Sequence, residues 1–270
     1  MLDSRRTARN SLMVINTKSV LKQIRSLERH LNRLRIIPAT NRLRSAVILP
    51  LLSKALTVSR AVCVLVDAGY PAEAFGLSRT AIEILFIVSY ISNKDTERRA
   101  RRYRDYDARA RVEFRKIAEK YAPKALAGTR QLDASVLELA DQYDKHSWLG
   151  RGQMATMAKE ENAVEFDKSG KGITIEFEYE ALYFWTSQYV HATVSALHGH
   201  ATHAREVFKV RADPEEDRGL DAHALRNVVV SLCQLFVYAC RAMNEDQPNA
   251  IHELFRMITR TARRKRRRTK

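Results

Sequence analysis

Glycine and proline, the residues that most often interrupt regular structure, are scarce in this sequence. The chain of 270 residues holds only 9 glycines and 6 prolines, which argues against a fold with many tight turns. Leucine, alanine, arginine and glutamate are plentiful, and such a composition is typical of long helices joined by few connections. We therefore predict an all-α fold, a multi-helix bundle that begins with a helical hairpin.

Cysteine is rare as well. The three cysteines, Cys63, Cys233 and Cys240, all lie in apolar helical stretches, where cysteine usually acts as a small buried hydrophobic residue. This usage indicates buried thiols in a reducing compartment and argues against cysteines that bind a metal or take part in catalysis. The N-terminal segment MLDSRRTARN leads into no apolar segment of the kind that a signal peptide needs. We expect a cytoplasmic protein without a cofactor.

The most apolar stretch of the chain, Ala74–Ser92, is too often interrupted to predict a membrane span. Its charge-free part, Ile84–Ile91, is far shorter than the ~20 residues that a bilayer requires. We predict a central core helix and no membrane contact. Arg79 and Glu83 lie four residues apart and therefore on one face of this helix. Because a buried ion pair is costly to desolvate, this pair needs further partners or a functional role.

Acidic residues are absent from the C-terminal segment. The whole chain has 47 Lys and Arg against 31 Asp and Glu, a net charge of +16, and residues 256–270 carry nine basic residues and no acid. Such a tail favours a polyanionic partner, which could be RNA, DNA or an acidic protein surface. A solvated tail that aids solubility is the alternative. The candidate nucleic-acid-binding residues are Arg263, Arg264, Lys265, Arg266, Arg267 and Arg268.

The first helix, within residues 12–35, has a coiled-coil-like seam. Its apolar residues recur at spacings of four, three, four and three. The seam could pack on the next helix, about residues 41–68, or join two copies of the chain. We divide the chain into an N-terminal helical element (1–40), a helical core (41–255) and a basic tail (256–270). The seam residues are Val20, Ile24, Leu27, Leu31 and Leu34.

A strongly charged helix is predicted over residues 95–121. Its apolar stripe, read as the face toward the core, includes Tyr103, Phe114, Ile117 and Tyr121. Asp107 falls on the same stripe, whereas Asp105 faces outward. An acid on a core-facing stripe requires a cation, and Arg79 of the adjacent helix is the candidate partner, either in a structural ion pair or in a site.

The second half of the core contains most of the histidines. We predict a long helix over residues 179–208, with Ser187 and His191 on one face. His191 is either a buried core histidine or an active-site group. No metal site is expected, because only His200 and His203 have the spacing of a ligand pair and both face away from His191. One small β-hairpin insertion is expected near residues 164–178.

Three segments carry a resemblance to a known family. They are LSRTAIEILFIVSYI followed by RARRYRDYDAR, then HSWLGRGQMATMAKE, then YFWTSQYVHATVSALH. In this order the chain resembles a family of bacterial all-helical proteins catalogued as a domain of unknown function. The resemblance covers about residues 45–240 and is carried by Arg79–Glu83, Trp148 and Ser187–His191. It implies a helical fold and no particular activity.

A broader analogy is to the HEPN-type helical ribonucleases of defence and toxin systems. Those proteins use an arginine followed four to six residues later by a histidine, and Arg25–His30 and Arg218–His223 have this spacing. The analogy implies a metal-independent ribonuclease.

Two functions therefore remain open. The first is a nucleic-acid-binding protein, acting as a metal-independent ribonuclease effector of a bacterial defence or toxin system. His191 would be the general acid or base, Arg79 would stabilise a phosphate, and Glu83 and Asp107 would orient Arg79. The second is a non-enzymatic scaffold or adaptor that binds an acidic partner. The first function requires Arg79, Glu83, Asp107 and His191 to meet where solvent reaches them.

Overall fold

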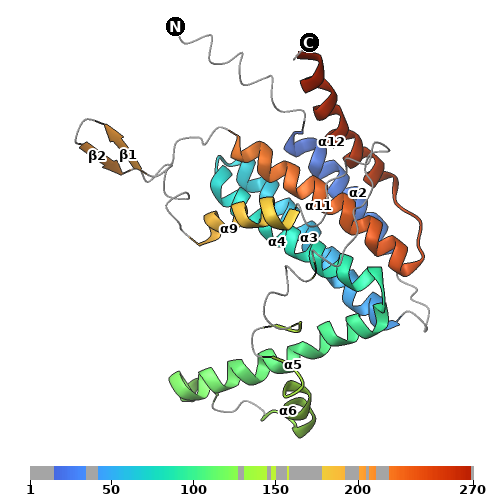
Figure 1. Cartoon of the computed structure of the whole chain (residues 1–270), viewed down its shortest axis with the longest axis vertical. Coiled ribbons are helices and arrows are strands. Elements are labelled where there is room, and N and C mark those ends of the chain that lie inside the picture. Colours follow the sequence, from blue (N-terminus) through green and yellow to red (C-terminus); the bar gives the residue numbers. More distant parts are fainter. Residues whose placement is uncertain are drawn as a thin grey trace.

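The chain forms an all-α, multi-helix bundle with one small pair of strands (Figure 1), so the predicted fold class is confirmed. The computed structural model describes residues 15–34, 42–126, 131–144, 147–149, 157, 178–191, 201–204, 207–210 and 219–268. The α-helices are α2 (Thr17–Arg33), α3 (Arg42–Asp67), α4 (Pro71–Asn93), α5 (Thr96–Tyr121), α6 (Ala134–Ala140), α9 (Phe184–Val190), α11 (Leu220–Met243) and α12 (Asn249–Arg268). A 3-10 turn (Pro123–Leu126), a π-helical turn (Glu178–Tyr183) and strands β1 (Ala201–Ala204) and β2 (Val207–Val210) complete the described elements.

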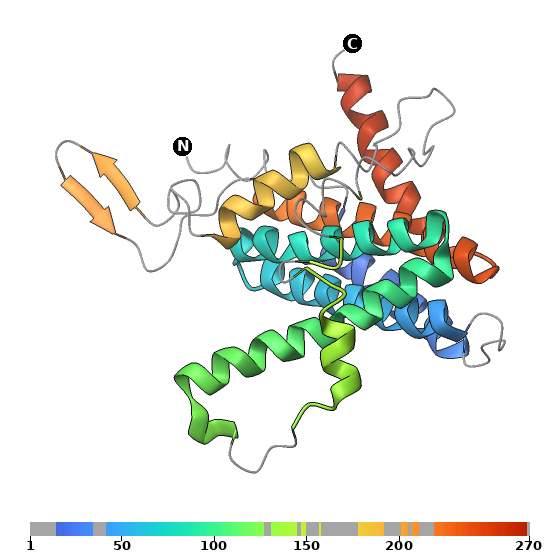
Figure 2. The same ribbon diagram turned by 60° about the horizontal axis from the view of Figure 1, so that its bottom comes forward.

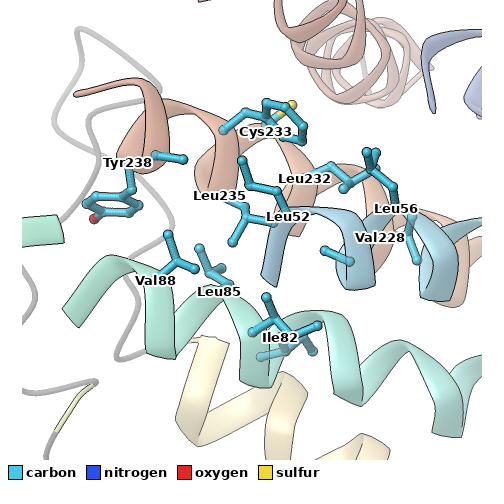
Figure 3. Packing of buried hydrophobic residues seen from close by; sticks show 14 of the residues in the cluster. Leu52, Leu56, Ile82, Leu85, Val88, Val228, Leu232, Cys233, Leu235 and Tyr238 are labelled. Carbon is cyan, nitrogen blue, oxygen red and sulfur yellow. The ribbon is translucent and has the colours of Figure 1, made fainter. Parts of the chain in front are cut away.

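Helices α3, α4 and α11 form the centre of the bundle. Helix α4 packs against both α11 and α3, and α11 also contacts α3. Figure 3 shows Leu85 and Val88 of α4 facing Leu235 and Tyr238 of α11. Leu52 of α3 reaches the same apolar layer, and its side chain is fully buried. The predicted central helix is therefore a core helix.

A short connection joins α3 to α4 where the sequence predicts it. Gly69 has a φ of +85°, a left-handed conformation that suits glycine. Pro71 then begins α4 in the first turn, where the missing N–H of proline has no helical partner to lose. This tight turn brings α4 back along α3.

The seam of α2 is buried inside the chain. Asn16 caps the helix by accepting a hydrogen bond from the Ser19 N–H at 2.8 Å. Val20, Ile24 and Leu27 are completely inaccessible to solvent, and α2 contacts α3 and α12. The predicted helical hairpin is present, and α2 shares one hydrophobic core with the helices after it. Association of two copies through this seam would first require α2 to leave the bundle.

We expect Leu27→Ala to lower the free energy of unfolding by about 2–5 kcal/mol, because it leaves a cavity beneath α2. Chemical denaturation followed by circular dichroism measures this effect. Leu137→Ala is the matched control, since Leu137 is 45% exposed and its replacement should change stability by less than about 0.5 kcal/mol. Equal effects of the two substitutions would show that the seam does not contribute to the core.

Three helices are long and apolar enough to cross a membrane by length and composition alone. They span Leu43–Asp67, Pro71–Asn93 and Leu220–Met243. In the bundle these helices bury one another, with 72% of the most apolar window of α4 and 83% of that of α11 inside the protein. Their burial against one another is enough to explain why these helices are so apolar. The absence of membrane contact stays a prediction.

Helix α5 turns only the first part of its predicted core-facing stripe toward the core: Tyr103 packs against it, whereas the second half of the stripe is exposed. Phe114, Ile117 and Tyr121 are 70%, 57% and 73% exposed. The second half of α5 extends away from the bundle together with α6 (Figure 1, Figure 2). Ala108 and Val112, on another face, pack against α6 instead. The predicted orientation was wrong for the second half of α5, because α6 covers the face that carries Ala108 and Val112.

The predicted helix over residues 179–208 is wrong at residues 201–204 and 207–208, which form strands; residues 192–200 lie outside the described residues. The segment begins as a π-helical turn and continues as α9. His191 is the C-cap residue of α9, with a non-helical backbone (φ −97°, ψ 16°). Strands β1 and β2 then pair antiparallel, with Ala201 opposite Val210. The β-branched residues of this segment favour strands over a helix. Residues 164–177, where a hairpin was predicted, lie outside the described residues.

Helix α12 continues through the boundary at residue 255. Ile251 and Leu254 are buried in the bundle, and the helix runs on to Arg268. Its C-terminal end extends away from the other helices (Figure 1). The basic residues of the predicted tail, from Arg263 to Arg268, thus lie on a helix that is anchored in the core.

Candidate functional site

Arg79 holds together a cluster of polar side chains from two distant parts of the chain. Its Nε donates to Glu83 Oε1 at 2.9 Å, one helical turn further along α4. Its Nη2 donates to the Tyr183 hydroxyl at 2.7 Å, and its Nη1 lies 3.1 Å from His191 Nε2. The guanidinium therefore binds an acid, a phenol and an imidazole at the same time. We call these four residues the Arg79 cluster.

The contact with Arg79 involves Nε2, the ring nitrogen of His191 at the tip of the side chain. Arginine has only donors, so His191 must accept through Nε2. The Nε2 lone pair, which a general base would use, is aimed at Arg79 in this arrangement.

Packing of α9 on α4 positions the members of the cluster that come from the second half of the chain. Gly76 of α4 lies at this contact, where an added Cβ would make ordinary van der Waals contact with the Cβ of Tyr189, 3.5 Å away. The ring of Phe75 meets the Tyr189 ring edge-on, with centroids 5.2 Å apart. Phe86 likewise contacts the Tyr183 ring at 6.0 Å. These contacts fix Tyr183 and His191 at the two ends of α9.

The Arg79 cluster lies at the edge of the core, where solvent reaches it. The side chains of Arg79 and Glu83 are 17% and 29% exposed, and His191 is exposed. Burial, followed by the negative charge of Glu83, raises the pKa of the Tyr183 phenol above its ordinary value of 10.0. The phenol therefore stays protonated at neutral pH. The cluster combines fixed donors with an accessible imidazole.

The structure separates Asp107 from the Arg79 cluster. The Asp107 side chain is 59% exposed and pairs with Arg111 at 2.6 Å on the surface of α5. Asp105, expected to face outward, is the better buried of the two acids, at 12% exposure, and pairs with Arg104. The prediction of an Asp107–Arg79 pair was wrong, because α5 is exposed to solvent at Asp107. Of the four residues that the ribonuclease hypothesis requires to meet, Arg79, Glu83 and His191 do so and Asp107 does not.

Tyr183 is the member of the cluster that the sequence analysis missed. It is the first residue of the segment YFWTSQYVHATVSALH that carries the family resemblance, and it lies eight residues before His191. A search for aromatic as well as acidic partners of Arg79 in that segment would have found it. Ser187, which the resemblance singled out, makes a hydrogen bond within its own helix, to the Tyr183 carbonyl at 2.6 Å.

Trp148 has a structural environment away from this cluster. It is only 3% exposed, and its ring meets Tyr90 and Tyr103 edge-on, with centroids 5.6 and 5.3 Å away. Arg102 of α5 donates to the Trp148 carbonyl at 2.7 Å. The segment around Trp148 thus ties α5 to the end of α4.

Other histidines give no second cluster in the part of the chain that is described. His223 packs on Phe75, with ring centroids 6.3 Å apart, and burial lowers the pKa of His30 below 6.5. The Arg218 side of the predicted Arg218–His223 pair lies outside the described residues. Among the residues with a described position, no three His, Cys, Asp or Glu side chains are close enough to hold a metal ion.

We expect the three cysteines to react with a thiol reagent only after unfolding. Burial raises the pKa of Cys63 to about 12 and that of Cys240 to about 11, and it raises the pKa of Cys233 as well, from an ordinary value of 9.0. The reactive thiolate is therefore depleted in the folded protein at pH 8. Fast labelling of any one cysteine in the native protein would contradict the core packing around it.

The fold and the cluster together define an all-α protein with an arginine–tyrosine–histidine cluster at the junction of two packed helices. A family model matches residues 45–207, more than half of the chain, and the chain belongs to that family, which is described as a family of unknown function (DUF5677). The predicted family resemblance is thereby confirmed. All four residues of the Arg79 cluster lie within the matched range. No curated protein and no solved structure matches the chain.

Proposed function

We propose that the protein binds nucleic acid and cleaves RNA without a metal ion, with the Arg79 cluster as its active site. The observation that carries the proposal is the contact of Arg79 with His191, which lies 112 residues away in sequence and is open to solvent. Arginine can stabilise a phosphate, and histidine can transfer a proton near neutral pH. A role in a bacterial defence or toxin system rests only on the analogy with HEPN-type ribonucleases.

The proposed reaction uses the 2′-hydroxyl of RNA as the nucleophile. When a substrate phosphate accepts from Arg79 Nη1, Nε2 of His191 is released and takes the 2′-hydroxyl proton. The 2′ oxygen attacks phosphorus, and the bond from phosphorus to the 5′ oxygen breaks. The leaving 5′ oxygen takes a proton from water, and the products are a 2′,3′-cyclic phosphate and a 5′-hydroxyl.

Two residues keep Arg79 in place during this reaction. Glu83 accepts from Nε, and the Tyr183 hydroxyl accepts from Nη2, which leaves the N–H groups of Nη1 for the phosphate. The Arg79 Cζ atom lies 4.6 Å from the centroid of the Tyr183 ring, a cation–π distance. A guanidinium held on two sides needs little reorganisation to stabilise the charge that develops on the phosphate.

The basic end of α12 supplies the non-specific affinity in this proposal. The six residues from Arg263 to Arg268 are all basic and belong to a helix whose apolar face is buried in its first turns, at Ile251 and Leu254. Their attraction to phosphates does not depend on base sequence and falls with salt. RNA would thus be recruited by α12 and cleaved at the Arg79 cluster.

The proposal is tested by incubating the protein with total RNA and with total DNA, in EDTA. We expect RNA to be degraded and DNA to remain intact, because only RNA has a 2′-hydroxyl. His191→Ala should remove the activity, and His252→Ala should retain it, since His252 is an exposed histidine of α12. Degradation of both nucleic acids, or equal activity of the two variants, would refute the proposed mechanism.

The second candidate function is a scaffold or adaptor that binds an acidic partner protein. The exposed side chains of Phe114 and Ile117 on α5 favour it, because exposed apolar groups on an extended helix are typical of an interaction surface. A wild-type protein that neither binds nor cleaves RNA or DNA would favour this function.

A further inference from the structure

Two large aromatic side chains next to the Arg79 cluster are exposed. Phe184 and Trp185, the first residues of α9, are 59% and 54% exposed, although Tyr183 immediately before them is half-buried. Neither side chain contributes to the core that holds α9 on α4. As consecutive residues of a helix, the two side chains point about 100° apart and offer two separate exposed rings beside the proposed active site.

Phe184 also shares a face of α9 with His191. The two residues are seven positions apart, which is close to two helical turns, so both point to the same side. The separation along the helix is ~10 Å. Successive stacked bases lie about 3.4 Å apart along a strand, so a base on Phe184 would belong to a nucleotide up to about three steps from the one at His191.

We propose that Phe184 and Trp185 form a stacking platform for unpaired bases, and that the substrate class is therefore single-stranded RNA. This inference rests on the proposed function of the Arg79 cluster. Aromatic side chains bind single strands by stacking on bases of any sequence, whereas the bases of a duplex are already stacked on one another. The net charge of +16 suits the phosphates of such a strand.

The tryptophans of the chain allow a direct test. There are two, Trp148 and Trp185; Trp148 is 3% exposed, and Trp185 is 54% exposed. The emission of Trp185 is thus the longer in wavelength and the one that a stacked base can quench. The probe is an uncleavable 12-nucleotide 2′-O-methyl oligoadenylate, which is titrated into the wild-type protein, into His191→Ala and into Trp185→Phe.

We expect the oligonucleotide to quench the long-wavelength emission in both the wild type and His191→Ala. Trp185→Phe should lose the quenching but keep its affinity within a few-fold, as measured by anisotropy of a labelled probe. Phe184→Ala should weaken binding about 5- to 150-fold, the range for loss of one stacked base. Tyr121→Ala, at an exposed aromatic residue of α5, is the matched control and should bind normally. A blunt duplex of the same length should quench little.

The outcomes separate this inference from the proposed function. Quenching and Phe184-dependent binding without any RNA cleavage would support the platform and refute the ribonuclease. Cleavage of RNA without quenching, with Phe184→Ala as active as the wild type, would refute the platform and leave the ribonuclease standing. Equal binding and quenching by the duplex would also overturn the platform.

Discussion

Replacing Arg79 with alanine should lower the rate of RNA cleavage about 100- to 1,000-fold, the usual effect of removing one donor that stabilises transition-state charge. The free energy of unfolding should change only slightly. Glu83 is 29% exposed and can turn to water, so we expect a loss of only about 1–2 kcal/mol. The melting temperature should fall by a few degrees. Single-turnover cleavage and a thermal melt measure the two effects.

Arg115→Ala is the matched control for this prediction. Arg115 and Glu119 on α5 have the same four-residue spacing and the same Nε–Oε1 distance of 2.9 Å as Arg79 and Glu83, but they lie outside the Arg79 cluster. Cleavage by Arg115→Ala should equal that of the wild type. A collapse of stability in Arg79→Ala that replacing both Arg79 and Glu83 with leucine reverses would instead identify a structural ion pair.

Removing the charges at the end of α12 should make RNA binding much less dependent on salt. Each phosphate contact with a single strand contributes about 0.7 to the slope of log affinity against log salt, so six contacts contribute about 4. Replacing all six basic residues from Arg263 to Arg268 with glutamine should remove up to this amount. Binding measured between 50 and 200 mM salt gives the slope.

The matched control replaces the five arginines among those six residues with lysine. This variant keeps every charge, so its slope should stay near that of the wild type if the contacts are electrostatic. The buried part of α12, including Ile251 and Leu254, is unchanged in both variants, and the melting temperature should remain the same. An unchanged slope in the glutamine variant would show that this helix end does not bind the RNA.

Local sequence signals predicted the elements well where local chemistry determines them. The break between α3 and α4 follows from Gly69 and Pro71, and the seam of α2 follows from the spacing of Val20, Ile24 and Leu27. The orientation of α5 did not follow. A helical repeat identifies an apolar stripe but does not say which element packs on it. In the structure α6 packs on a different face of α5, the one with Ala108 and Val112.

Only the part of the candidate site that lies within one helix could be predicted from the sequence. Arg79 and Glu83 are joined by a spacing within one helix, which sequence alone reveals. The contact between Arg79 and His191 depends on how α9 packs on α4, across 112 residues. Charge matching favoured Asp107 as a further partner, but the helix packing brings the phenol of Tyr183 to Arg79 instead.

The most direct measurement of the proposed activity is mass spectrometry of the products from one single-stranded RNA oligonucleotide, in EDTA. The oligonucleotide carries a single 2′-deoxynucleotide. We predict products with 2′,3′-cyclic phosphate and 5′-hydroxyl ends, no cut after the deoxynucleotide, and no products from His191→Ala. Products with 3′-hydroxyl and 5′-phosphate ends, or the same products from His191→Ala, would contradict the assignment of the Arg79 cluster as the active site.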